Sequence, residues 1–302
     1  MSGALDRLLD RTGRDDDAIA CAKLQAMRRL VLMTLAFEGW IALRYVPYSE
    51  SPGLHATIAA ALGLCALLGW MDRFALPALF AAMLLEVVTV ASVFPHNGNH
   101  QFLAIVLLAL IALAYPGLHR ESRPDPGDAR TAIAAMRWIV LAGLVWSGVM
   151  KLVYGYWLGG EFLSYRIALD PGFARVFAAI VPDAEMARLV ALENRIGAGP
   201  FRAEAPLLVA VSNLTWIAEI VLPLGLLLPR TRTFAMLALL ALMVAIQAGA
   251  RELFFAGMMF GGLLLFARRD LVGRLIPVAG ISYAIWLVWP WISRASSGGA
   301  SS

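Results

Sequence analysis

Residues 136–160 read MRWIVLAGLVWSGVMKLVYGYWLGG, a long apolar run that carries one lysine, Lys151, near its end. A helix needs about 20 mostly apolar residues to cross the hydrocarbon core of a bilayer. Met136–Trp157 is therefore a predicted membrane-spanning helix. Charged groups inside such helices are rare because their burial in lipid is costly. The stretch thus predicts a membrane fold and marks Lys151 as a residue that needs a partner or a function.

The rest of the chain repeats this pattern. Of its 302 residues, 60% are hydrophobic and 15% are charged, with a mean hydropathy of +0.73, well above that of water-soluble domains. Further candidate spans lie near residues 28–46, 55–71, 74–94, 99–116, 206–228, 233–249, 252–267 and 276–292. We predict an all-α, polytopic integral membrane bundle of eight or nine transmembrane helices.

The order of spans divides the chain into three parts. We expect a cytosolic polar leader over residues 1–27, one transmembrane domain over residues 28–293, and a disordered Gly/Ser-rich tail over residues 294–302. The leader lacks the pattern of a cleaved signal peptide. Within the domain, residues 158–205 alternate short apolar patches with charges, which predicts helices lying on the outer membrane surface.

The distribution of basic residues predicts the orientation. With the N-terminus inside, 16 of the 25 Lys and Arg residues fall on the inner side, 8 fall on the outer side, and Lys151 lies within a span. This bias favours a cytoplasmic N-terminus in a multi-pass inner-membrane protein. It also explains the net charge of +4 without a nucleic-acid partner.

Four charged residues inside predicted spans need a partner or a function: Glu38, Glu86, Lys151 and Glu219. One interpretation of Lys151 is structural, with its amine snorkelling to the interface or pairing with one of the glutamates. The other is that desolvation leaves a neutral amine able to take a proton from a substrate. Only two of the 25 basic residues are lysines, and arginine cannot give up its proton, so a retained lysine favours a titrating role.

Two other polar stretches are predicted on the same outer side as the end of the Lys151 helix. They are FPHNGNHQFL at residues 94–103 and IQAGARELFFAGMMF at residues 246–260. The glycine between His96 and His100 separates the two imidazoles, so we expect no metal site. Ordinary interfacial loops are the simpler interpretation of both stretches. The two cysteines, Cys21 and Cys65, are interpreted as structural thiols.

Several of these stretches resemble one family. SGVMKLVYGYWLGG, residues 147–160, resembles a motif in which small residues lead into Lys-Leu, followed by Trp and Gly. Three other segments of the same group resemble GNHQFL, ARELFFAGMMF and AEIVLPLGLLLPRTR. Together, the matching motifs cover residues 94–266 of this sequence. The family is the HTTM (horizontally transferred transmembrane) domain family, related to the membrane domain of vitamin K-dependent gamma-carboxylase.

The resemblance implies a possible chemistry. In the carboxylase a lysine acts as the base toward vitamin K hydroquinone and a histidine assists carboxylation, which points to Lys151 and His100 as catalytic residues. The cofactor would be a quinone or hydroquinone. We expect Asn99, Gln247, Glu252, Trp157 and Glu219 to contribute to binding.

The sequence also departs from the carboxylase pattern. Gln247 stands where the group has a histidine, and the spacing from lysine to Trp157 is one residue longer. The carboxylase also has a large lumenal domain that holds its protein substrate, whereas this sequence ends soon after its last predicted span, so we expect no such domain here. We therefore expect carboxylase-like lyase or oxygenase chemistry at most, and no glutamate carboxylation.

Two functional hypotheses remain open at this point. The first is an HTTM-type enzyme module that binds a quinol-like or other apolar small molecule and uses Lys151 as general base. The second is a non-catalytic membrane partner or scaffold subunit, bound to a separate protein, in which Lys151 is a structural ion-pair residue. A transporter ranks third because no inverted repeat is visible.

Overall fold

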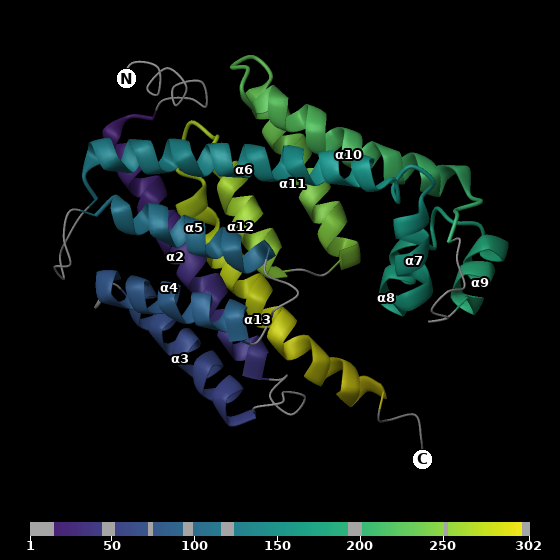
Figure 1. Cartoon of the computed structure of the whole chain (residues 1–302), viewed down its shortest axis with the longest axis horizontal. Coiled ribbons are helices and arrows are strands. Elements are labelled where there is room, and N and C mark those ends of the chain that lie inside the picture. Colours follow the sequence, from purple (N-terminus) through teal and green to yellow (C-terminus); the bar gives the residue numbers. More distant parts are fainter. Residues whose placement is uncertain are drawn as a thin grey trace. The chain divides into compact units, whose positions relative to one another are not determined.

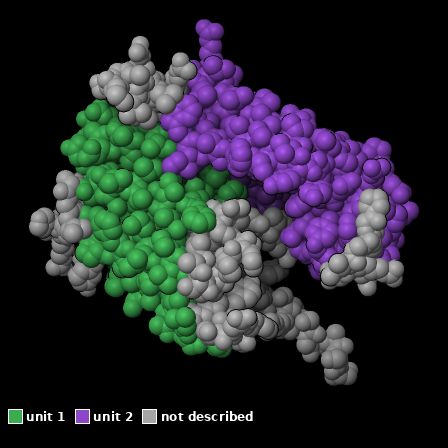
Figure 2. Space-filling view, viewed as in Figure 1, with its two compact units in different colours: residues 1–10, 14–137, 253–302 green, residues 11–13, 138–252 purple. Residues whose placement is uncertain are grey.

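The computed structural model describes residues 15–43, 52–71, 75–92, 99–115, 124–192, 201–250 and 253–297. Every regular element within these residues is a helix (Figure 1). The chain divides into two compact units, which Figure 2 shows in different colours. Unit 1 comprises residues 1–10, 14–137 and 253–302, and unit 2 comprises residues 11–13 and 138–252. Each unit is described by itself.

Each of the nine stretches predicted as spans contains a helix within its described residues. The corresponding helices are α2 (Asp17–Ala42), α3 (Pro52–Trp70), α4 (Ala75–Ser92), α5 (Asn99–Leu113), α6 (Pro126–Tyr154), α10 (Pro206–Leu226), α11 (Arg232–Ala250), α12 (Leu253–Leu264) and α13 (Val272–Ser297). The all-helical fold class is confirmed for the described residues.

Three of these helices are long and apolar enough to cross a membrane by length and composition. They are Pro52–Gly69 within α3, all of α6, and all of α10. Shorter apolar helices of 10–17 residues occur within α4, α5, α11, α12 and α13. The structure thus supports membrane-spanning helices, whereas a bundle of eight or nine spans stays a prediction.

Helix α2 lies at the centre of unit 1, where it packs against α3, α5, α12 and α13. Its buried face includes Leu24, Met27 and Val31, which recur at helical spacing. A methyl group at Gly39 would lie 2.6 Å from the carbonyl oxygen of Ala59 on α3. Glycine at this position therefore permits close contact between the two helix backbones, as small residues do in membrane helix pairs.

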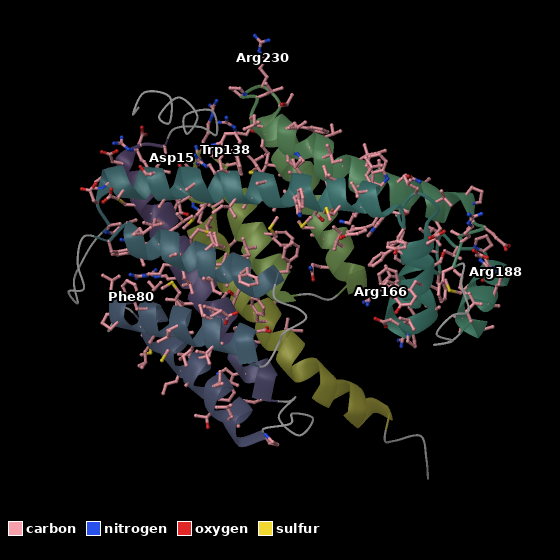
Figure 3. The ribbon with its side chains drawn as sticks, in the orientation of Figure 1. Asp15, Phe80, Trp138, Arg166, Arg188 and Arg230 are labelled. Carbon is pink, nitrogen blue, oxygen red and sulfur yellow. The ribbon has the colours of Figure 1, made fainter. Side chains whose placement is uncertain are left out.

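Polar groups fasten the first turns of α2 to the segment that follows α12. The fully buried Lys23 amine donates hydrogen bonds to Asp15 Oδ1 at 2.8 Å and to the carbonyl oxygen of Leu265 at 2.9 Å. Arg137 donates to the same carbonyl at 3.0 Å and to Asp15 Oδ2 at 2.6 Å (Asp15 is labelled in Figure 3). Residues 17–27, which we assigned to the polar leader, thus begin a packed helix.

Unit 2 contains the last part of α6, the pair α10 and α11, and a cluster of three short helices. These are α7 (Glu161–Leu169), α8 (Pro171–Phe177) and α9 (Asp183–Ala191), with α7 packed against both α8 and α9 (Figure 1). They share an apolar core that includes Leu163, Ile167, Phe173, Leu189 and Leu208. The prediction of short amphipathic helices in residues 158–205 agrees with this arrangement, while their placement on a membrane stays a prediction.

A charged network closes the helix cluster at α9. Arg188, labelled in Figure 3, donates to Glu185 Oε2 at 2.7 Å and to Oε1 at 2.9 Å. The backbone N–H of Glu204 donates to the same carboxylate at 2.8 Å. The Arg188 guanidinium holds the pKa of Glu185 below its usual value of 4.5, with the Glu204 N–H adding to the effect. This carboxylate therefore links α9 to the segment that enters α10.

Candidate functional site around Lys151

Helix α6 ends one turn after Lys151. Gly155 follows the last helical residue and has a φ of 73°, in the left-handed region that glycine adopts without strain. Gly160 has the same φ of 73° immediately before α7. A methyl group at Gly160 would lie 2.9 Å from the side chain of Ala203, so both conformation and space favour glycine there. The two glycines thus bound a short turn that carries Trp157.

The Lys151 amine is surrounded by acceptors. It donates hydrogen bonds to both carboxylate oxygens of Glu219 on α10, and to Ser147 Oγ at 3.0 Å. Its nitrogen also lies 4.9 Å from the centre of the Trp157 ring, in cation–π geometry. The Lys151 side chain is 17% exposed and the Glu219 side chain 3%. Lys151 is therefore the cation of a largely buried ion pair.

A close helix contact places the two charges together. A methyl group at Gly148 would lie 2.6 Å from Ile220 Cγ1 and 2.9 Å from the carbonyl oxygen of Trp216. Gly148 precedes Lys151 by three residues, so the two share a helix face. The absence of a side chain at Gly148 thus lets α6 and α10 approach one another at the ion pair.

Side chains of α10 also hold the turn after α6. Ser212 Oγ donates to the carbonyl oxygen of Trp157 at 2.7 Å, and Asn213 Nδ2 donates to that of Leu158 at 3.0 Å. The Trp157 ring stacks on Phe162, with ring centres 4.7 Å apart. Trp157 is therefore fixed through both its backbone and its ring, and its face is available to the Lys151 ammonium.

This arrangement determines what Lys151 can do chemically. The ammonium donates to three oxygen acceptors in two side chains, and a carboxylate is its direct partner. A general base must instead hold a free lone pair within hydrogen-bond reach of the substrate proton. In this geometry Lys151 would first have to leave Glu219 and lose a proton. The contacts fit a residue that stabilises the packing of α6 against α10.

Of the other predicted site residues, the structure describes the side chain of Gln247 but not those of Asn99, His100 and Glu252. Gln247 lies on α11 in unit 2, and its buried carboxamide has no hydrogen-bond partner within the described parts of the chain. Asn99 and His100 begin α5 in unit 1, and their side chains lie outside the described residues, as do His96 and Glu252. The structure thus brings together Lys151, Glu219 and Trp157 from the predicted set.

Three polar residues of this site were not predicted from the sequence. Ser147 precedes Lys151 by four residues, a spacing that places both on one helix face and was available as a signal. Ser212 and Asn213 are small polar residues in an otherwise apolar helix, a pattern common at contacts between membrane helices. The partners of these two lie in a turn, which no helical spacing could identify.

Comparison with known proteins adds no relative to these observations. No family model matches the chain, and no curated protein or solved structure matches it significantly.

Proposed function

We propose that the chain is a non-catalytic helical membrane subunit, a partner or scaffold for another protein, in which Lys151 is a structural ion-pair residue. The observation that carries the proposal is the pairing of the Lys151 ammonium with both carboxylate oxygens of Glu219. A buried pair of this kind fixes the register of two helices, because either charge left alone would be costly. Its position beside Gly148 fits that role.

Membrane insertion is part of the same proposal. Three helices of sufficient length and apolarity support it, together with the excess of basic residues on the predicted inner side. We propose a multi-pass inner-membrane protein with a cytoplasmic N-terminus and a relationship to the HTTM domain family. The motifs quoted from residues 94–266 support that relationship.

An activity assay distinguishes a non-catalytic subunit from an enzyme. The purified chain in detergent would be given reduced menaquinone under air, and quinol consumption would be compared between wild type and Lys151→Arg. Arginine keeps a positive charge for Glu219 but cannot act as a base. We expect the two proteins to behave alike, with no turnover above the protein-free reaction. Turnover in wild type that Lys151→Arg abolishes would overturn the proposal.

One observation favours the enzyme as a second candidate. The buried carboxamide of Gln247 has two donors and one acceptor, none of which is satisfied among the described residues. Buried polar groups without partners are uncommon, and a bound ligand is one way to satisfy them. In that case an apolar small molecule such as a quinol would bind in unit 2. The Lys151→Arg comparison decides between the two candidates.

A further inference from the structure

A further buried carboxylate, that of Glu86, lies in unit 1. Glu86 lies within α4 and its side chain is 1% exposed. Both of its carboxylate oxygens are buried and have no hydrogen-bond partner among the residues that the structure describes. Glu86 therefore differs from Glu219, whose two oxygens both accept hydrogen bonds.

One charged neighbour of Glu86 is another acid. Glu38 on α2 lies close enough to act electrostatically on Glu86, and also on the phenol of Tyr283 on α13. The Tyr283 ring stacks on Phe37, with ring centres 4.8 Å apart, and its hydroxyl lies against Gly257 of α12. Glu38 thus lies within electrostatic range of both the Glu86 carboxyl group and the Tyr283 phenol in unit 1.

Basic groups on α2 are remote from this cluster. Arg29 is the nearest, nine residues before Glu38, which corresponds to roughly 13 Å along the helix axis. The electrostatic effect on Glu86 comes from Glu38, and no basic residue in the described part of the chain contributes to it. Among the residues that the structure describes, no cation therefore neutralises this pair.

An ionised carboxylate buried without a partner is strongly disfavoured, and such a group takes up a proton instead. Two carboxylates that share one site also cannot both be ionised at low cost, because their like charges repel. A proton bound to Glu86 removes the charge of the more deeply buried carboxylate and the repulsion between the two groups. It also supplies a hydroxyl donor to a site where the described residues offer acceptors and no cation.

We propose that Glu86 and Glu38 form a proton-binding site in the interior of unit 1, which holds one proton at neutral pH. The site is independent of Lys151 and lies in a different unit. It gives the chain a group that can gain or lose a proton within its apolar core.

Other titratable groups on the helices packed against α4 must be considered in any test. These helices are α2, α3 and α5. The side chains of His55 and His100 lie outside the described residues. The titratable or charged residues of these three helices are Asp17, Cys21, Lys23, Arg28, Arg29, Glu38, His55, Cys65 and His100.

Infrared spectroscopy of the purified full chain in detergent tests the site directly. A protonated carboxyl gives a C=O band that is separate from the carboxylate bands and shifts in D₂O. We expect this band in wild type at pH 7 and its loss in Glu86→Gln. The half-buried Glu161 in unit 2 provides the matched control, and Glu161→Gln should leave the band unchanged. Glu38→Gln should keep the band and shift its frequency.

The wild-type spectrum keeps the test decisive even if Glu86→Gln does not fold. Absence of a protonated carboxyl band in wild type at pH 7 would overturn the proposal. So would a band that Glu86→Gln retains. A metal cation in place of the proton would appear as a sodium-dependent rise in the unfolding midpoint of wild type without the band, which also overturns it.

The unfolding midpoint of wild type supplies a second readout. The unfolded chain releases this proton above about pH 4.3, the usual value for glutamate, whereas the folded chain keeps it. The native state then binds more protons than the unfolded state, so stability falls as pH rises. We expect the wild-type midpoint to fall from pH 5.5 to 7.5 more steeply than that of Glu86→Gln. Equal slopes would contradict the proposal.

Discussion

Replacement of Lys151 by methionine removes the cation that Glu219 faces inside unit 2. Methionine is unbranched and of similar length, so the change removes charge with little change in packing. The Glu219 side chain is 3% exposed, and Lys151 is its only hydrogen-bond donor among the described residues. We expect Lys151→Met to reduce the free energy of unfolding by about 3 kcal/mol, the lower end for a broken buried pair.

The reverse substitution should be milder. In Glu219→Leu the remaining ammonium is 17% exposed, keeps Ser147 and Trp157, and can move its flexible stem toward the surface. We expect a loss of about 1 kcal/mol, the typical value of a net hydrogen bond. The double variant should lie within about 1 kcal/mol of wild type, because an apolar pair of similar volume replaces the charges. The coupling energy is then about 4 kcal/mol.

The assay is a double-mutant cycle measured by circular dichroism during unfolding in mixed detergent micelles. Arg202 and Glu161 provide the matched control, since their closest atoms are 3.7 Å apart and the side chains are 77% and 33% exposed. The cycle with Arg202→Met and Glu161→Leu should give a coupling below about 1 kcal/mol. A Lys151–Glu219 coupling as small as this control would refute the reasoning. So would a larger cost for Glu219→Leu than for Lys151→Met.

Three further predictions concern packing, pH and topology. Gly148→Ala should lower the unfolding free energy by about 1–3 kcal/mol because its methyl group meets α10. Gly143→Ala on the same helix meets nothing within 4 Å and should be neutral or raise stability by up to about 1 kcal/mol, so equal losses would contradict the packing. The pKa of Glu185 is lower in the folded state than in the unfolded state, so its ion pair contributes stability above pH 4.5, where the carboxyl group is ionised in both states. As the pH falls below 4.5, the unfolded state takes up the proton first and the contribution is lost. The unfolding midpoint of wild type should therefore fall with acid below pH 4.5 more steeply than that of Glu185→Gln, and parallel curves would count against the ion pair. A periplasmic reporter fused to the C-terminus should be active if nine helices span the membrane and inactive if eight do, whereas an active reporter at the N-terminus would exclude the proposed orientation.

The positions of the helices were largely predictable from the sequence. Each apolar run is long enough to form a helix whatever it packs against, so run length alone located nine helices. The start of α2 was missed because residues 17–27 carry several charges. The helical spacing of Ala20, Leu24, Met27 and Val31 was nevertheless present, and all four are buried.

The partner of Lys151 could not be chosen in this way. Glu38, Glu86 and Glu219 are all acids inside apolar runs, and nothing in their sequence surroundings distinguishes one of them as the partner of Lys151. The structure pairs Lys151 with a residue 68 positions away and leaves Glu86 without a partner in the described chain. Such pairing depends on which helices are in contact and on where each residue lies along its helix axis. The local sequence around a residue indicates neither of these. The sequence predicted which residues required an explanation, while the fold assigned their partners.

Each unit of this protein contains one lysine, and in both cases the amine is engaged in hydrogen bonds of the folded chain. Lys23 is fully buried in unit 1, and Lys151 is hydrogen-bonded within unit 2. Acylating reagents that modify neutral amines should therefore react with each lysine only when its unit opens. Pulse labelling followed by mass spectrometry of the two lysine peptides would time the opening of the two units separately, in one sample and without an introduced probe.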